Sequence, residues 1–234
     1  MPITASEILS QAHIILQDGA ATRWPLTELV KWMNAGLREI TLHKPTVSSS
    51  TVVFPLVSGT KQTLPDGYNA LLRVTRNMTG TDPTYVGGAS VTQIAREILD
   101  VQNPNWHDPA RTPFRATVRH VIADPLEQRV FYVYPGNTGT GKIECIMSTI
   151  LADIAADVGD DPEDIDSYSD KTIPIPVIYQ SALMDYILSR AFSKDMQYGG
   201  AADRAQMHYQ QFANALGIKG QAEMAFGINS QQTA

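Results

Sequence analysis

The chain has 234 residues, of which 43% are hydrophobic, and its formal net charge is −6. This share of apolar residues is enough for a buried core, whereas the negative charge argues against a basic surface that wraps nucleic acid. A single cysteine, Cys145, excludes an internal disulfide framework.

No apolar run approaches the roughly 18 residues that a membrane span needs. The start of the sequence, MPITASEIL, lacks the basic and apolar regions of a signal peptide. We therefore expect a soluble protein that is made in a cytoplasm and has no membrane partner.

Two helices are predicted at the start of the chain. Thr4 and Glu7 have the spacing of a capping box. The apolar residues that follow recur with a helical period: Ile8, Leu9, Ala12, Ile15 and Leu16. A second helix begins near Pro25 and ends before Pro45, because proline cannot continue a helix. Its apolar stripe comprises Leu26, Leu29, Val30, Met33, Leu37 and Ile40.

The middle of the chain is predicted to be rich in strands. Short β-prone runs alternate with proline and glycine from residue 47 onward. Ser90 and Gln93 form a second capping-box pattern, which predicts a helix with Ile94, Ile98 and Leu99 on one side. The segment FRATVRHVIADPLEQRVFYVYP indicates a β-hairpin around Asp124-Pro125, and residues 142–150 add a strand.

Helices are predicted again near the end of the chain. Pro174 and Pro176 suit a first helical turn, and the apolar face that follows comprises Ile178, Ala182, Leu183, Tyr186, Ile187 and Ala191. The last helix carries Ala205, Tyr209, Phe212 and Leu216, and Gly217 is a natural C-cap. Residues 218–234 are predicted to form an extended tail.

The predicted fold is therefore α+β. Residues 1–46 and 172–217 form an antiparallel helical bundle. Residues 47–171 form a β-rich insertion of antiparallel hairpins with one helix and an acidic loop at 151–170.

The stretch VYPGNTGTGKIE raises the question of nucleotide binding. Gly136, Gly141 and Lys142 have most of the spacing of a phosphate-binding loop. The residue after Lys142 is Ile143, so the Ser or Thr that would hold magnesium is missing. The residues that follow predict a strand, whereas such a loop must open a helix. A long hairpin turn is the favoured interpretation, and no cofactor is expected.

Candidates for catalysis and metal binding are weak. The five histidines lack metal-ligand spacing, and His107 beside Asp108 does not make a triad. No enzyme is predicted.

The segment 151–170 holds eight acidic residues and no Lys or Arg: Asp153, Asp157, Asp160, Asp161, Glu163, Asp164, Asp166 and Asp170. It lacks the ordered pattern of a calcium-binding loop. A solvated loop, a calcium site and a surface that lines a DNA passage all stay open. In the last case Asp157, Asp160, Asp161, Glu163 and Asp164 would repel phosphates.

The tail carries Met224, Phe226 and Ile228 at every second position. This spacing places three apolar groups on one side of an extended segment. Such a segment either docks on a partner or stays disordered, and both interpretations stay open.

Two stretches resemble a known family. In WPLTELVKWMNAGLREITLHKP the pattern consists of Trp24, Glu28, Met33-Asn34-Ala35, Arg38-Glu39-Ile40 and Pro45. In the second stretch, residues 173–217, it consists of Ala191, Ser193-Lys194-Asp195, Ala201, Ala205, Tyr209, Phe212 and Leu216-Gly217. The order of these pieces, with the segment RVFYVYPGNTGTGKIECIMS between them, is similar to the head–tail adaptor (connector) proteins of short-tailed phages.

The resemblance implies a structural virion protein. Such adaptors form a ring of typically twelve copies under the portal, extend the DNA channel and provide the platform for the tail. The implied partners are the portal protein, tail tube or nozzle proteins, further copies of the chain, and double-stranded DNA that passes without specific binding. The C-terminal extension would contact the portal, with Met224, Phe226 and Ile228 as anchors. The nearest alternative is another tail-ring component, such as a tail-tube or nozzle subunit.

Overall fold

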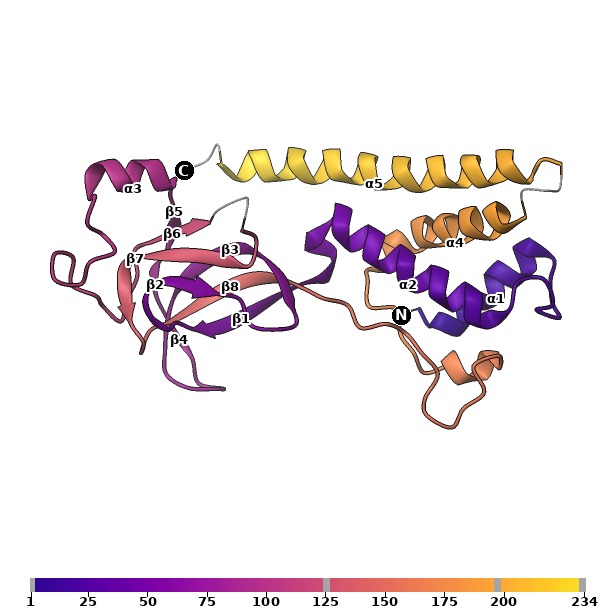
Figure 1. Cartoon of the computed structure of the whole chain (residues 1–234), viewed down its shortest axis with the longest axis horizontal. Helices are drawn as coiled ribbons and strands as arrows, with labels where there is room; N and C mark the ends of the chain where they lie inside the picture. Colours follow the sequence, from indigo (N-terminus) through magenta and orange to yellow (C-terminus); the bar gives the residue numbers. More distant parts are fainter. Residues whose placement is uncertain (1–2, 124–126, 196–198, 232–234) are drawn as a thin grey trace. The chain divides into compact units, whose positions relative to one another are not determined.

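The computed structural model describes residues 3–123, 127–195 and 199–231, and for residues 218–231 it describes the backbone alone. The chain separates into two compact units, Met1–Val47 with Leu151–Ala234, and Ser48–Ile150. In the described part, the chain has five α-helices and two four-stranded sheets (Figure 1). The predicted α+β class is confirmed. The acidic segment, expected in the β-rich part, instead lies in the helical unit.

The first two helices form where the sequence predicts them. Helix α1 spans Ala5–Leu16 and has the full capping box. The Thr4 N–H donates to the Glu7 carboxylate at 2.9 Å, and the Glu7 N–H donates to the Thr4 hydroxyl at 3.3 Å. Helix α2 spans Leu26–His43, directly after Pro25, and a short 3-10 turn, η1, follows at Pro45–Ser48. Ile15, predicted on the buried face, is 49% exposed.

The helix predicted at Pro174 and Pro176 begins later than expected. Pro176 precedes a 3-10 turn, η3 at Val177–Tyr179, and helix α4 spans Gln180–Lys194. Ile178 is exposed and does not join the apolar face. Another 3-10 turn, η2 at Ile165–Tyr168, lies in the acidic segment.

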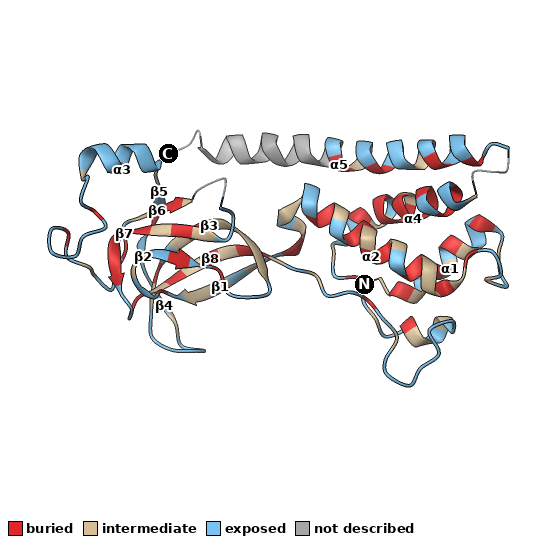
Figure 2. Cartoon of the chain, viewed as in Figure 1, coloured by how far each residue is buried: buried red, intermediate tan, exposed pale blue. Residues whose placement is uncertain are grey.

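The helical unit has one hydrophobic core. Figure 2 shows that the buried residues of α1 and α2 recur along one side of each helix, whereas α4 has buried residues on all its sides. Helices α2 and α4 approach closely at Gly36, where a Cβ atom would lie 2.8 Å from Leu183 and 2.9 Å from Tyr186. The absence of a side chain at Gly36 therefore permits the contact. The core includes Ile8, Leu9, Leu29, Met33, Leu37, Ile40, Leu183, Ile187, Phe212 and Leu216.

The last helix is longer than the sequence predicts. Helix α5 spans Ala201–Gln231, so the backbone of 218–231 is helical and the predicted extended geometry is wrong there. The physical reason is composition: the segment is rich in helix formers such as Gln and Ala and has no proline. Gly217 does not end the helix.

The β unit is built from two sheets whose inner residues share one core. The first sheet has the order β1-β8-β3-β4 and the second β2-β7-β6-β5. The core draws on both sheets and includes Leu64, Val74, Val121, Phe131, Val133, Ile143, Cys145 and Met147. The first sheet comprises β1 (Ser49–Pro55), β8 (Lys142–Thr149), β3 (Tyr68–Thr79) and β4 (Val86–Ser90). The second comprises β2 (Ser58–Thr63), β7 (Val130–Thr138), β6 (His120–Ala123) and β5 (Thr92–Gln93).

The pairing of these strands corrects two predictions. Strands β6 and β7 pair antiparallel as a hairpin, although its turn, residues 124–126, lies outside the described residues. Strands β7 and β8 belong to different sheets, so the turn between them is not a hairpin turn. Strands β5 and β6 are parallel, so the unit is not built of antiparallel hairpins alone. A core between two sheets requires the chain to pass from one sheet to the other, and the local sequence does not specify where it does so.

The second capping box does not form. Ser90 ends β4 and Gln93 ends β5, while helix α3 begins at Arg96 and ends at Gln102 without a side-chain cap. Backbone pairing prevails over the local motif, because the Val91 N–H donates to Thr75 of β3 at 3.1 Å. Of the three apolar residues predicted on one side of this helix, Ile94 precedes it, Leu99 is buried and Ile98 is exposed. Leu99 packs with Trp106 and Ile122 in a second, smaller core.

Candidate functional site

The residues of the family-like pattern join α2 to α4. The Trp24 indole N–H donates to the Ala191 carbonyl at 3.0 Å, and Lys194 pairs with Glu28 at 2.5 Å. Arg23 also forms an ion pair with Asp195. These contacts fasten the start of α2 to the end of α4. The pattern therefore has an architectural role in the helical unit.

Asp18 belongs to the same corner and was missed by sequence reasoning. Its carboxylate accepts hydrogen bonds from the backbone N–H groups of Thr22, Arg23 and Trp24 at 3.1, 2.8 and 2.8 Å. The Trp24 bond, more than the others, lowers the pKa of Asp18. The spacing Asp-x-x-x-Thr just before a helix was the sequence signal from which this carboxylate contact could have been predicted.

The first residues of the acidic segment are attached to helix α2. The Asn34 side chain, which is buried, donates to the Ile154 carbonyl at 2.8 Å and accepts from the Ile154 N–H at 2.9 Å. Arg38 forms an ion pair with Asp153. The Asn and Arg of the family-like pattern thus hold this segment against the helical unit.

Glu163 attaches the segment a second time. Its carboxylate accepts from the Leu26 N–H at 2.7 Å and from the Thr27 hydroxyl at 2.6 Å. Since Pro25 provides no side-chain cap, Glu163 caps the N-terminus of α2 from a distant part of the sequence. The hydrogen bond from Thr27, and then that from Leu26, lower the pKa of Glu163. Glu163 therefore has a structural role as the N-terminal cap of α2.

The other four predicted channel acids are exposed: Asp157, Asp160, Asp161 and Asp164. Asp157 pairs with Lys171 at 2.8 Å. Asp161 and Asp164 accept backbone N–H groups within the segment, from Glu163 and Asp166. In the part of the chain that the structure describes, no three His, Cys, Asp or Glu side chains gather in a metal-binding arrangement.

The glycine-rich turn is closed by a buried asparagine. The Asn137 side chain accepts from the N–H groups of Gly139 and Gly141 at 2.8 and 3.1 Å, and donates to the Ala116 carbonyl at 2.9 Å. A Cβ at Gly141 would lie 2.1 Å from that carbonyl. Lys142 opens strand β8 and donates to the Gly80 carbonyl at 2.6 Å. The amides and the lysine are thus engaged within the protein, and the turn has the geometry of a packed connection.

His107 does not form a dyad with its neighbour Asp108. Its Nδ1 lies 2.7 Å from the Thr60 hydroxyl, and its ring stacks on Trp106. Burial and, secondarily, Arg96 lower the pKa of His107. Asp108 instead accepts the Ala110 N–H at 2.9 Å. His107 is exposed and lies against Trp106, a buried residue of the smaller core.

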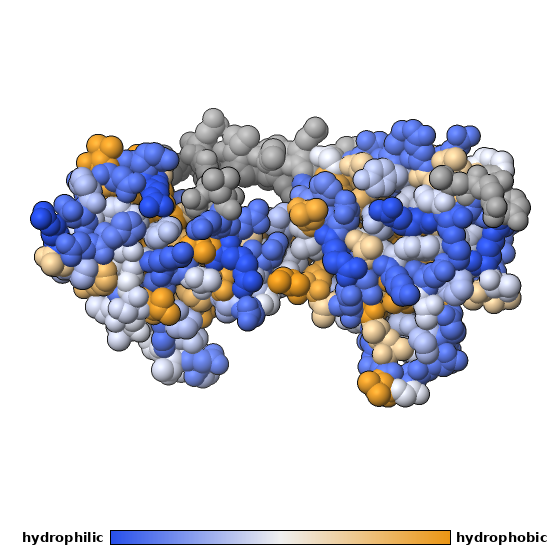
Figure 3. All heavy atoms as spheres, viewed as in Figure 1, coloured by the Kyte–Doolittle hydropathy of each residue, from blue (hydrophilic) through white to orange (hydrophobic). Residues whose placement is uncertain are grey.

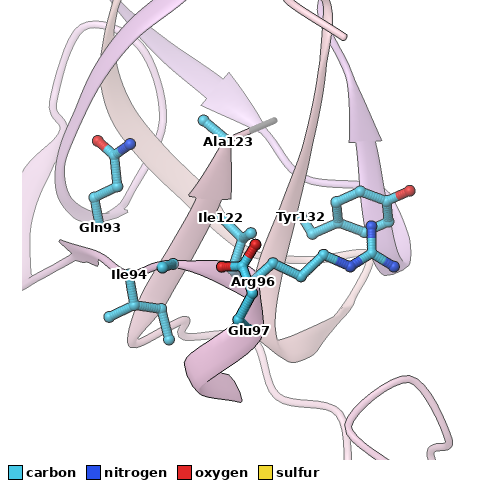
Figure 4. Close-up of a pocket in the computed structure, with 8 residues that line it drawn as sticks. Gln93, Ile94, Arg96, Glu97, Ile122, Ala123 and Tyr132 are labelled. Carbon is cyan, nitrogen blue, oxygen red and sulfur yellow. The ribbon is translucent and has the colours of Figure 1, made fainter. Parts of the chain in front are cut away.

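A hollow of about 420 Å³ lies beside α3 and strands β5 to β7 (Figure 4). Its charged residues are Arg96 and Glu97. The Arg96 guanidinium lies 5.1 Å from the centre of the Tyr132 ring and 3.5 Å from Asp100. Arg96 is therefore held by its own neighbours, and the hollow has no convergent set of polar groups.

One face of the surface is mostly hydrophilic. Figure 3 shows hydrophilic residues over most of one face, with apolar atoms in small separate groups. Among the described residues, no helix has the length and apolar character needed to cross a membrane. The predicted portal anchors Met224, Phe226 and Ile228 have side chains outside the described part of the chain.

In the described residues, the distinctive side chains of the family-like pattern fasten elements of the helical unit together. The model of the SU10 adaptor protein family matches residues 3–232. The chain therefore belongs to this family and is a phage adaptor protein, a structural class and not an enzyme class. A search of curated proteins gave no match.

Proposed function

We propose that the protein is a head–tail adaptor of the virion that forms a ring under the portal. The ring extends the DNA channel and provides the platform for tail attachment, with tail tube or nozzle proteins on its far side. The observation that carries this proposal is the family match along residues 3–232, which includes both motif-bearing helices and the C-terminal helix.

The C-terminal segment is the proposed portal contact. An extended chain places Met224, Phe226 and Ile228 on one side. An α-helix instead places residues four apart, such as Met224 and Ile228, on one face and directs the residue between them away. The two bound forms therefore differ in the role of Phe226.

The proposed lining of the channel comprises Asp157, Asp160, Asp161, Glu163 and Asp164. Asp157, Asp160, Asp161 and Asp164 present negative charge to solvent, and such charge repels DNA phosphates so that DNA passes without sticking. Glu163 would contribute charge here while it caps α2. Replacing Asp157, Asp160, Asp161 and Asp164 together by Asn should slow DNA passage in ejection assays without changing assembly.

The deciding experiment measures mass by light scattering for the chain mixed with the portal ring of the same phage. The full chain is compared with a chain that ends at Gly220. We expect a large complex with the full chain and its loss on truncation. A complex that survives truncation moves the contact to the helical body, and no complex with the full chain contradicts the portal role and favours a tail-tube or nozzle subunit.

Single substitutions refine the same experiment. Met224→Ala and Ile228→Ala should weaken portal binding in either bound form. Phe226→Ala should weaken it equally only if the segment docks as a strand. The matched control is Gln221→Ala, a polar position in the same segment.

A further inference from the structure

The outer strands of the first sheet carry no charged side chain that would hinder pairing with another chain. Exposed sheet edges normally carry charges or prolines, or are very short, because their free N–H and C=O groups can pair with another chain. In the second sheet, β2 carries the exposed Lys61 and β5 has two residues. Strands β1 and β4 carry no charged residue. Pro55 stands only at the end of β1, and β4 is a five-residue strand whose pairing with β3 shifts register between Arg76 and Met78.

The hydrogen-bonding pattern shows which groups point outward. The Leu56 N–H donates toward β8, to the Gly141 carbonyl at 2.9 Å. Because the direction alternates along a strand, Thr51 and Val53 direct their backbone groups away from β8. On the other side, the Val91 N–H donates toward β3, so its neighbour Ser90 directs its own groups away from that strand.

Strand β4 belongs to an exposed but well-braced arm, residues 79–90. All its residues except Tyr85 are exposed, as the pale blue of this segment shows in Figure 2. Lys142 donates to Gly80 at 2.6 Å and lies 5.4 Å from the centre of the Tyr85 ring. The buried Asn77 donates to the Ala89 carbonyl at 3.0 Å. The arm is therefore held in shape from its β3 side, although it buries little of its own surface.

The directions of the two edges fit each other. All three pairings in this sheet are antiparallel, so β1 and β4 run in opposite directions. If a second copy is placed beside the first in the same orientation, its β1 runs antiparallel to β4. We propose that the protein self-associates head to tail, with the β4 edge of one copy adding to the β1 edge of the next.

The absence of charge and the strand directions favour a second copy of the chain as the occupant, although one junction buries little area. Neither edge strand brings a charge that would stand opposite a like charge. A junction of one five-residue strand buries less than the roughly 1,200 Å² of a stable pair. Each junction is therefore weak alone, and closure, in which every copy makes two such heterologous contacts, stabilises the assembly. This inference rests on the proposed ring-forming function.

The test uses thiol cross-linking of the full chain. Ser90→Cys and Thr51→Cys place thiols at exposed positions of the two edges. Burial raises the pKa of the native Cys145 thiol to about 12, so it stays unreactive. The two variants are mixed at the concentration where light scattering first detects assemblies, and a short bifunctional thiol reagent is added.

We expect a cross-linked pair in the mixture, while each variant alone gives at least about tenfold less product, because a head-to-tail contact brings unlike edges together. The control pair is Ser90→Cys with Thr63→Cys, an exposed position on β2. Equal cross-linking in the control pair, or in either variant alone, overturns the proposal.

A charge variant provides a second readout. Thr51→Lys should lower the apparent association constant by at least about tenfold, because a charged edge resists pairing. Thr63→Lys, on the edge that already carries Lys61, should not. If assemblies form but neither the cross-linking nor the association constant depends on β1 and β4, the proposed interface is wrong and the ring function stands. If no assembly forms alone or on the portal ring, both proposals fail.

Discussion

Replacing the buried Asn34 by leucine should loosen the acidic segment from the helical unit. Asn34 and Ile154 are 7% and 8% exposed, and the asparagine side chain satisfies both backbone groups of Ile154. Leucine has the same number of side-chain heavy atoms and the same branch point but cannot form either hydrogen bond. Each unsatisfied buried group costs about 1–3 kcal/mol.

The expected loss in free energy of unfolding is about 2–4 kcal/mol, since the segment can partly relax toward water. This is a large share of the roughly 5–15 kcal/mol by which a domain is stable. Arg38→Ala is the matched control, because it removes an exposed ion pair between the same helix and the same segment. Its cost should be about 0–1 kcal/mol.

The assay is hydrogen exchange by mass spectrometry combined with urea unfolding of the full chain. Peptides from 151–170 and from α2 should exchange faster in Asn34→Leu, while peptides from β8 should not change. The reasoning is refuted if Asn34→Leu costs less than about 0.5 kcal/mol, or no more than Arg38→Ala.

Three further predictions test individual contacts. Glu163→Gln should be less stable than the wild type at neutral pH by about 1 kcal/mol. The pKa of Glu163 is lowered in the folded state, so the stability that the carboxylate adds is present above the ordinary pKa of 4.5 and is lost as the pH falls below that value. The urea midpoints of the two proteins should therefore converge at low pH. A difference that stays constant with pH would contradict the capping role. Gly36→Ala should destabilise the helical unit by about 1–3 kcal/mol, since the added Cβ would lie 2.8 Å from Leu183. An unchanged thermal midpoint would show that α2 and α4 can move apart at no cost. Calorimetric titration with ATP and magnesium should give no heat of binding for wild type or Lys142→Ala, whereas exchange of residues 79–86 should rise in the variant because Gly80 loses its donor.

Part of this architecture could be predicted because the signals are local. The capping box at Thr4 and Glu7 and the prolines at 25 and 45 act within a few residues, so α1 and α2 form where the sequence predicts them. The same kind of signal was wrong at Ser90, where pairing with β3 replaced the cap. Local patterns hold when no distant strand competes for the same backbone groups.

The candidate site was predictable in composition but not in geometry. The cluster of acids at 151–170 is visible in the sequence, yet its attachment to α2 through Asn34 and Glu163 joins residues more than a hundred positions apart. The same limit applies to Lys142, whose spacing suggested a phosphate ligand and whose contact is the Gly80 carbonyl.

The sequence alone determined the α+β class, the first two helices and the family, because composition, caps and the order of motifs are properties of the chain itself. Only the tertiary structure decided which sheet each strand joins, that β1 and β4 are left as uncharged edges, and that Glu163 caps a helix. These features depend on long-range pairing, in which a residue's partner is chosen by the packing of the whole unit and leaves no period or spacing in the sequence.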